Sequence, residues 1–167
     1  MKVENNQPIK IGIRKAIRLD VPQIFELIQE LALFEKAPHE VTNSPEQLLK
    51  DGFGENPLYG CYVALANEKV VGMALYYFRY STWKGKRLYL EDIIVNEKYR
   101  GKQIGRHLMD AVLDESLKTN CSGILWQVLD WNEPAIQFYK KYNPTFDNEW
   151  INVAMSKDDV SLYLSKL

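Results

Sequence analysis

The sequence contains little cysteine, and the cysteines it has are widely spaced. Cys61 and Cys121 are the two cysteines among 167 residues, and no C-x-x-C pair is present. A disulfide framework uses several paired cysteines, and a structural zinc site uses clustered ones. We therefore predict free thiols in a reducing compartment, both packed as small core residues, and no metal site.

An excess of charge of either sign is also missing. The 21 Lys and Arg residues nearly balance the 22 Asp and Glu residues, which gives a formal net charge of -1. A protein that binds nucleic acid or an anionic membrane through its bulk charge carries a basic excess. Neither partner is therefore expected, and any electrostatic role must be local.

Long apolar runs are absent as well. The longest run, residues 70–78, includes Gly72 and is far shorter than the ~20 residues that a membrane-spanning helix needs. Residues 1–8 have no apolar signal core. We expect a soluble, cytoplasmic protein with a disordered lead-in over residues 1–8 and a single domain over residues 9–167, a length that suits one core.

The order of apolar patterns predicts an α/β fold. Alternation and β-favouring composition indicate strands over residues 9–18, 59–66, 70–80, 87–95, 121–128 and 150–155. Helical spacing indicates helices from residue 20 to 34, after Ser44, from residue 104 to 117, after Asn132 and after Ser156. Asp20 with Gln23 has the pattern of an N-terminal cap. The prediction is a mixed, mostly antiparallel sheet flanked by helices.

Residues 88–106 carry the main chemical signals. An apolar strand, 88–95, contains the adjacent carboxylates Glu91 and Asp92, and a turn rich in glycine and basic residues, 100–106, then opens a helix. Consecutive backbone N–H groups at a helix start can cradle a phosphate. An ordinary strand-to-helix turn with exposed basic side chains is the alternative. The turn is neither a Walker motif, since no G-K-[ST] follows, nor a dinucleotide fingerprint, since its glycines are wrongly spaced.

The two carboxylates and one tyrosine are candidates for proton transfer. Because side chains alternate along a strand, Glu91 and Asp92 are expected on opposite faces. Either each meets an arginine or lysine across the sheet, or the strand opens at a site that needs carboxylates. Tyr139 shares a helical face with Asn132, and a phenol that is neutral near pH 7 can donate a proton to a leaving thiolate. A core tyrosine is the alternative.

Several motifs together resemble a known family. Residues 99–105, after an apolar strand, resemble the acetyl-CoA pyrophosphate loop of the GNAT N-acetyltransferase superfamily. Further motifs, in the same order along the chain, resemble the diamine acetyltransferase family within it: residues 51–54, 56–57, 76–78, 80–85, 89–92, 130–132 and 138–140. The resemblance covers roughly residues 9–155.

The resemblance implies a splayed sheet, acetyl-CoA as cosubstrate and a homodimer. The pantetheine arm would lie along the strand at 93–95, with the diphosphate on the backbone of residues 101–106. The implied cofactor-binding residues are Ile93, Ile94, Val95, Arg100, Gly101, Lys102, Gln103, Ile104, Gly105, Arg106 and Asn132. In the family, a tyrosine at the position of Tyr139 protonates the departing CoA thiolate, and an acid at the position of Glu91 accepts the amine proton through water.

Two positions depart from the family pattern. Gln103 stands where the family loop usually has its middle glycine, and glutamine has less freedom at positive φ, which bears on cofactor affinity. Asn143-Pro144 replaces a glycine after the tyrosine helix, where asparagine tolerates a left-handed cap.

The segment 80–83 bears on the acceptor amine. Polyamine-acetylating members tend to carry an aspartate where this chain has Ser81, and the segment resembles the branch that acetylates thialysine, a lysine analogue. Losing a carboxylate weakens attraction for a polyamine. The candidates for holding a cationic amine are Glu35, Trp83, Asp92, Glu149 and Trp150.

The function predicted is acetylation of a primary amine of a small molecule, thialysine or a related amino acid before diamines and polyamines. A polyamine-preferring spermidine/spermine acetyltransferase is the nearest alternative. A non-catalytic acyl-CoA-binding module and an acetyltransferase of proteins are the others.

Overall fold

The computed structural model describes residues 10–167, so the lead-in predicted over residues 1–8 lies outside the described residues. The chain divides into two compact units, one up to Gln127 and one from Val128, and each is described by itself. The single domain predicted over residues 9–167 stays a prediction.

The elements of the first unit are β1 (Ile11–Lys15), α1 (Val21–Phe34), α2 (Pro45–Phe53), β2 (Gly60–Ala66), β3 (Lys69–Ser81), β4 (Gly85–Val95), α3 (Ile104–Lys118) and β5 (Ile124–Leu125). The second unit contains α4 (Glu133–Lys140) and α5 (Lys157–Leu164).

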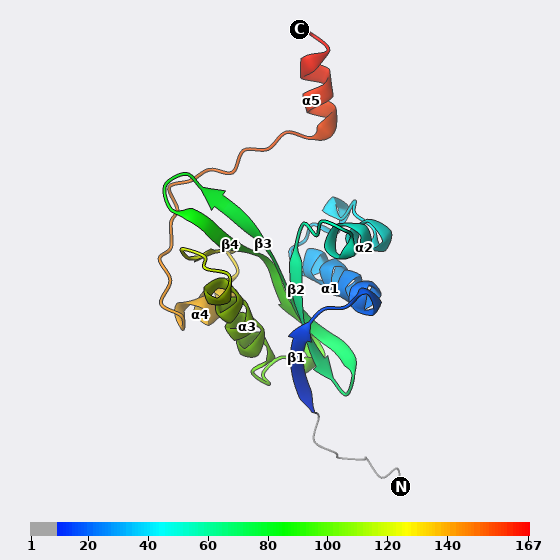
Figure 1. Cartoon of the computed structure of the whole chain (residues 1–167), viewed down its shortest axis with the longest axis vertical. Coiled ribbons are helices and arrows are strands. Elements are labelled where there is room, and N and C mark those ends of the chain that lie inside the picture. The colour runs from blue at the N-terminus through cyan, green and yellow to red at the C-terminus, as the bar shows by residue number, and fades with distance from the viewer. Residues whose placement is uncertain (1–9) are drawn as a thin grey trace. The chain divides into compact units, whose positions relative to one another are not determined.

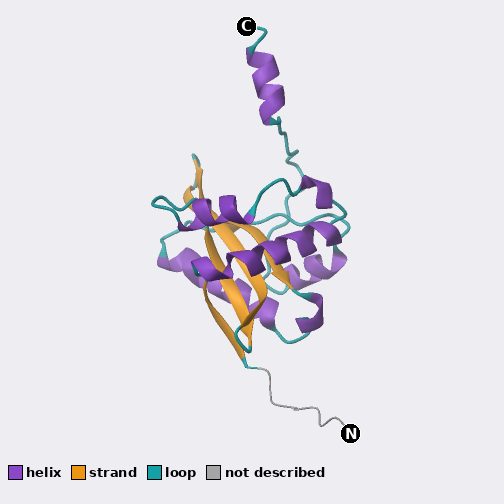
Figure 2. Ribbon diagram, turned by 90° about the vertical axis from the view of Figure 1, so that its right-hand side faces the viewer, coloured by secondary structure: helices purple, strands orange, loops and turns teal. Residues whose placement is uncertain are grey.

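The first unit is built on one sheet with strand order β1-β2-β3-β4-β5. All neighbours are antiparallel except β4 and β5, which pair in parallel over Leu88↔Ile124 and Tyr89↔Leu125. Helices α1 and α2 cover one face, and α3 covers the other (Figure 1 and, turned by 90°, Figure 2). The mixed, mostly antiparallel sheet flanked by helices is therefore confirmed.

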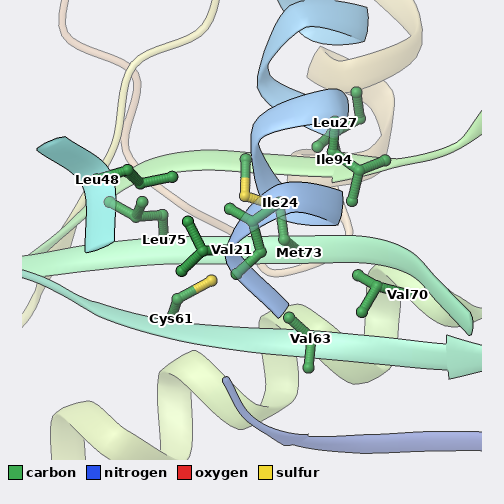
Figure 3. Packing of buried hydrophobic residues seen from close by; sticks show 10 residues of the cluster. All are labelled: Val21, Ile24, Leu27, Leu48, Cys61, Val63, Val70, Met73, Leu75 and Ile94. Atoms are coloured by element: carbon green, nitrogen blue, oxygen red, sulfur yellow. The ribbon is translucent and has the colours of Figure 1, made fainter. Parts of the chain in front are cut away.

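The hydrophobic core fills the space between the sheet and helices α1 and α2. One cluster of buried side chains, drawn in Figure 3, joins both helices to β2, β3 and β4: Val21, Ile24, Leu27, Leu48, Cys61, Val63, Val70, Met73, Leu75 and Ile94. Residues 70, 73, 75 and 94 of this set belong to β3 and β4. Burial of these apolar side chains therefore determines which face of β3 and β4 packs against α1 and α2. This face is called the α1–α2 face below.

The opposite face of the sheet is tied to α3 by polar contacts as well as packing. Tyr62 of β2 donates its hydroxyl to Glu115 of α3 at 2.8 Å, and Lys15 of β1 reaches the same carboxylate at 3.1 Å. Leu108 and Val112 of α3 are fully buried. These contacts hold the helix whose first turn forms the predicted phosphate site.

The helix starts at Ser44 and Ser156 are confirmed. Ser44 accepts from the Gln47 N–H at 3.2 Å, with Pro45 at the first helical position. Ser156 accepts from the Asp159 N–H at 3.1 Å, and the Asp159 carboxylate accepts in return from the Ser156 N–H.

Asp20 is the N-cap residue of α1, as its pattern with Gln23 predicted, but its side chain makes no capping hydrogen bond to the helix. The Asp20 carboxylate accepts two hydrogen bonds from Arg14, at 2.6 and 2.8 Å, and one from the Ile17 N–H at 2.7 Å. Burial opposes ionisation, but Arg14 and Ile17 outweigh it, so the pKa of Asp20 lies below its usual range. Gln23 instead accepts from the Val70 N–H at 3.1 Å. The buried carboxylate pairs with a guanidinium rather than with its own helix.

Two predicted strands differ from the structure. The strand predicted over 121–128 is confined to Ile124–Leu125, because its pairing with β4 ends after two residues. The strand predicted over 150–155 is absent, since no strand in residues 10–167 pairs with that segment, and Ile151 and Val153 are 87 % and 90 % exposed. An apolar alternating segment becomes a strand only where a ladder partner exists.

Within residues 10–167, no helix has both the length and the apolar character needed to cross a bilayer.

Candidate active site

A β-bulge in β4 places the two adjacent carboxylates. Leu75 of β3 lies opposite Asp92, and the next residue, Tyr76, lies opposite Leu90, so Glu91 is the extra residue of the bulge. Glu91 and Asp92 were predicted to lie on opposite faces because side chains alternate along a regular strand. The bulge interrupts this alternation at Glu91. Asp92 shares the α1–α2 face with Leu75.

Three carboxylates gather around this bulge. Burial raises the pKa of Asp92 to about 6, and the negative charges of Glu91 and Glu35 add to the rise. Glu35, which follows the last turn of α1, also has a raised pKa because it is partly buried. No ion pair joins any of the three to a cation within residues 10–167. Of the two alternatives for the acidic strand, the structure therefore favours an open site that needs carboxylates.

Replacing Asp92 with asparagine is expected to stabilise the fold near neutral pH. Folding favours the protonated acid, so the contribution of Asp92 to stability is fully present below pH 4 and is lost as the pH rises through about 6. The Asp92→Asn variant should match the parent at pH 4 and exceed its free energy of unfolding by about 2 kcal/mol at pH 7 and above. Urea unfolding between pH 4 and pH 8 measures the difference.

Asp114→Asn is the matched control, because Asp114 pairs with Lys118 on the exposed surface of α3 at 2.5 Å. Because this pair is exposed to solvent, the Asp114→Asn variant should unfold at nearly the same urea concentration as the parent at every pH. A stability gap for Asp92→Asn that does not change with pH would contradict the raised pKa.

The edge of β4 beyond the bulge has no strand beside it among the described residues. Pairing with β5 ends at Tyr89, whereas β4 continues to Val95. The Asn96 N–H donates to Val71 of β3, so the alternation of an antiparallel pair turns the peptide groups of Ile93 and Val95 away from β3. By the same alternation, the peptide group of Ile94 points toward β3, and the Ile94 side chain lies in the core. The sheet is therefore open along residues 93 to 95.

The turn after β4 contains a run of backbone N–H groups that leads into the first turn of α3. Gly101 has a φ of 77°, and Gln103, at the N-cap of α3, has a φ of 62° and a ψ of 8°. None of the N–H groups of residues 101–106, Ile104 and Gly105 included, donates to an acceptor within residues 10–167. Such a nest at a helix N-terminus binds anions.

The basic side chains of the turn are partly engaged. Arg100 donates through Nε to the Val95 carbonyl at 3.0 Å, and Arg106 lies 3.6 Å from Asp110. Lys102 lies 5.6 Å from the centroid of the Tyr99 ring. All three remain exposed, so they add positive charge around the nest.

In the second unit, Asn132 and Tyr139 mark the two ends of α4. Asn132 is the N-cap and accepts from the Ala135 N–H at 3.3 Å. Tyr139 is buried, and its ring meets that of Phe138 edge-on, with centroids 5.3 Å apart. Asn143 has a φ of 52°, which confirms the expected left-handed residue after this helix.

The remaining predicted acceptor residues are exposed. Trp83 lies in the β3–β4 connection and is 85 % exposed, and Glu149 and Trp150 of the second unit are exposed as well. In the first unit the structure thus brings Glu35 together with Glu91 and Asp92, and leaves Trp83 on the surface.

Comparison with known proteins identifies the family. The acetyltransferase (GNAT) family profile matches residues 22–143. The chain belongs to this family. Acetyltransferases of the family use acetyl-CoA.

The relatives include mouse thialysine N-epsilon-acetyltransferase, 46 % identical over 136 residues that cover 77 % of this chain and 80 % of the relative. The human spermidine/spermine N(1)-acetyltransferase-like protein 1 is 38 % identical over 134 residues, which cover 76 % of this chain and 19 % of that protein. An aminoglycoside N-acetyltransferase in complex with CoA shares the fold, with a TM-score of 0.71 and 15 % identity over 91 % of this chain and 98 % of that one. The chain is therefore an amine acetyltransferase.

The geometry of the acetyltransferase suits acetyl-CoA. The diphosphate needs N–H donors, and the nest at 101–106 has N–H groups that meet no acceptor in the described part of the chain. The pantetheine arm contains amides, and the open edge of β4 has peptide groups turned outward at Ile93 and Val95.

Replacing Gln103 with glycine is expected to stabilise the acetyltransferase. A non-glycine residue in the left-handed region is strained by about 1 kcal/mol, and glycine relieves this strain at the cost of some chain entropy. The free energy of unfolding in urea should rise by up to about 1 kcal/mol. The Kd of CoA, measured by calorimetry, should fall or stay equal because the nest keeps its N–H groups.

Gln29→Gly is the control for this substitution. Gln29 is an exposed glutamine inside α1, where glycine costs about 1 kcal/mol. A loss of stability for Gln103→Gly similar to that of Gln29→Gly would show that position 103 is not strained.

Four residues of the β3–β4 hairpin near the three carboxylates were not predicted from the sequence as candidate site residues. Tyr77 lies opposite Tyr89, and Arg79 lies opposite Arg87, on the same face as Leu75 and Asp92. Counting back in pairs from the turn at 82–84 would have found both pairs.

Proposed function

We propose that the acetyltransferase acetylates the side-chain amine of a small amino acid, thialysine or a close analogue, ahead of diamines and polyamines. The observation that carries this proposal is the group of carboxylates, Glu35, Glu91 and Asp92, without a cation partner in the described chain. The similarity to thialysine acetyltransferases supports the order of acceptors. An alkyl ammonium ion is the partner that the three carboxylates lack.

The proposed reaction is direct transfer, without a nucleophilic cysteine. An ammonium ion must lose a proton before it attacks the thioester, and Glu91 accepts this proton through water. Asp92 and Glu35 hold the amine by charge. The outward N–H groups of β4 at 93–95 stabilise the oxyanion of the tetrahedral intermediate. Tyr139 donates the proton that the departing thiolate takes up.

The hairpin connection supports the preference against polyamines. The Ser81 hydroxyl accepts from the N–H groups of Trp83 and Lys84 at 3.3 and 3.2 Å, so it serves the turn itself. An aspartate there would add a negative charge next to Trp83, and serine adds none. With serine at position 81, this connection therefore lacks a negative charge that would attract the second ammonium group of a polyamine.

A screen of amines that follows thiol release from acetyl-CoA tests the proposal. Thialysine should give a higher kcat/KM than spermidine when both are measured side by side. A tenfold preference for spermidine would reverse the order of acceptors. Binding of acetyl-CoA without thiol release for any amine would indicate the non-catalytic acyl-CoA-binding module.

A further inference from the structure

Two arginines face each other near the end of the β3–β4 hairpin. Arg79 and Arg87 lie directly opposite in the register of the strands. Like charges in this position destabilise a sheet. No carboxylate within residues 10–167 forms an ion pair with either one.

The hydrogen bonds of Arg87 are incomplete. Its Nη2 donates to the Ile124 carbonyl at 3.3 Å, while its Nε is buried and has no partner in the described chain. A guanidinium with an unused donor, next to a second cation, is typical of a site that binds an anion. A carboxylate is the planar anion that a guanidinium fork matches.

A pair of tyrosines lies between these arginines and the carboxylates. Tyr77 and Tyr89 face each other with ring centroids 5.2 Å apart, one pair below the arginines on their face of the sheet. Burial raises the pKa of both tyrosines, Glu91 adds to the rise, and Arg79 acts against it. The negative charge of Glu91 and the positive charge of Arg79 therefore both act on this pair of tyrosines.

The spacing suits a lysine-like amino acid. The Arg79↔Arg87 pair lies four residue steps along β3 from the Leu75↔Asp92 pair, which is about 13 Å along the strand. An extended side chain with six or seven bonds between amine and carboxylate spans roughly 8 Å. A hydrogen bond of about 2.8 Å at each end brings the total close to the spacing of the two residue pairs along the strand.

We propose that Arg79 and Arg87 bind the α-carboxylate of the acceptor while Glu35 and Asp92 hold its side-chain ammonium next to Glu91, the proposed base. This inference rests on the proposed function, and it names the feature that would select an amino acid. A polyamine has a second ammonium group where the amino acid has its carboxylate, and the arginines repel it. Acids, tyrosines and arginines in this order are complementary to a zwitterion with a long aliphatic chain.

The test compares thialysine with thialysine carboxamide, in which a neutral amide replaces the carboxylate. Wild-type enzyme should favour thialysine at least tenfold in kcat/KM. In Arg79→Gln the KM for thialysine should rise about tenfold with kcat nearly unchanged, while the constants for the carboxamide stay the same. Arg79→Lys, which keeps the charge but not the fork, should recover part of the loss.

Lys86→Gln is the matched control. It removes the same charge from the next residue to Arg87, but Lys86 lies over the Phe78 ring on the opposite face, 4.0 Å from its centroid. This variant should keep the wild-type ratio. Thermal unfolding of all variants shows that each is folded.

The outcomes separate the two proposals. Equal use of thialysine and its carboxamide by wild type, or an unchanged ratio in Arg79→Gln, would overturn the carboxylate site and leave amine acetylation intact. Wild-type enzyme that acetylates neither compound would overturn the proposed function itself.

Discussion

Replacing Tyr139 with phenylalanine is expected to lower kcat about 10³-fold, within the range that a general acid contributes. Tyr139 is 6 % exposed, and the substitution keeps its ring, which packs against Phe138, and removes only the hydroxyl. Without the donor proposed at Tyr139, the thiolate of CoA must leave unprotonated or take its proton from water. Steady-state thiol release at saturating acetyl-CoA and amine measures the loss, and the KM for acetyl-CoA should change little because binding does not need the proton.

Tyr142→Phe is the control for this prediction. Its ring meets the same Phe138 side chain, with centroids 5.6 Å apart, so it samples a similar change in the same aromatic cluster. Its kcat should remain within a few-fold of wild type. Full turnover by Tyr139→Phe at every pH would remove Tyr139 as the acid.

The local signals of the sequence predicted local structure well. Ser44 and Ser156 cap helices as their spacing indicated, and Asn143 takes the left-handed conformation expected after α4. Gln103 is the sharpest case. The resemblance to a glycine-rich loop suggested positive φ at that position, and the structure has a φ of 62° there. Helix caps and left-handed residues depend on a few neighbouring residues, so they can be predicted from a short stretch of the sequence.

The features that could not be predicted depend on distant partners. Nothing within residues 88–95 indicates the bulge at Glu91, because a bulge is a property of two paired strands. Asp20 has the local pattern of a cap, but Arg14, on the preceding strand, takes its carboxylate. The segment 150–155 has the alternation of a strand and no partner among the described strands.

The bulge also changes the faces of the sheet on which Glu91 and Asp92 act. With strict alternation, one of the two carboxylates would face α3 and the other α1. In the structure Asp92 shares the α1–α2 face with Leu75, and Glu91 is close enough to raise the pKa of Asp92. Two carboxylates and Glu35 therefore act on one region, which is what a site for an ammonium ion requires.

Replacing Glu91 with glutamine is expected to lower kcat about 10²-fold, since it removes the proposed base. It should also move the acid limb of the kcat/KM profile. In the wild-type enzyme that limb should lie near pH 6, where Asp92 ionises. Glu91 raises this pKa by its negative charge, so the limb should shift to lower pH in Glu91→Gln. The measurement is kcat/KM for thialysine between pH 5 and pH 9.

The Asp92→Asn profile separates the roles of the two acids. If Glu91 is the base and Asp92 holds the amine, Asp92→Asn should raise the KM of the amine and lose the limb near pH 6, while kcat falls less than in Glu91→Gln. If Asp92 is the base, Glu91→Gln should keep a nearly wild-type kcat and Asp92→Asn should lose it. The raised pKa of Asp92 makes this second result physically reasonable, because a base works best with a pKa near the working pH. The exposed position of Glu91 in the bulge, in reach of water, favours the first.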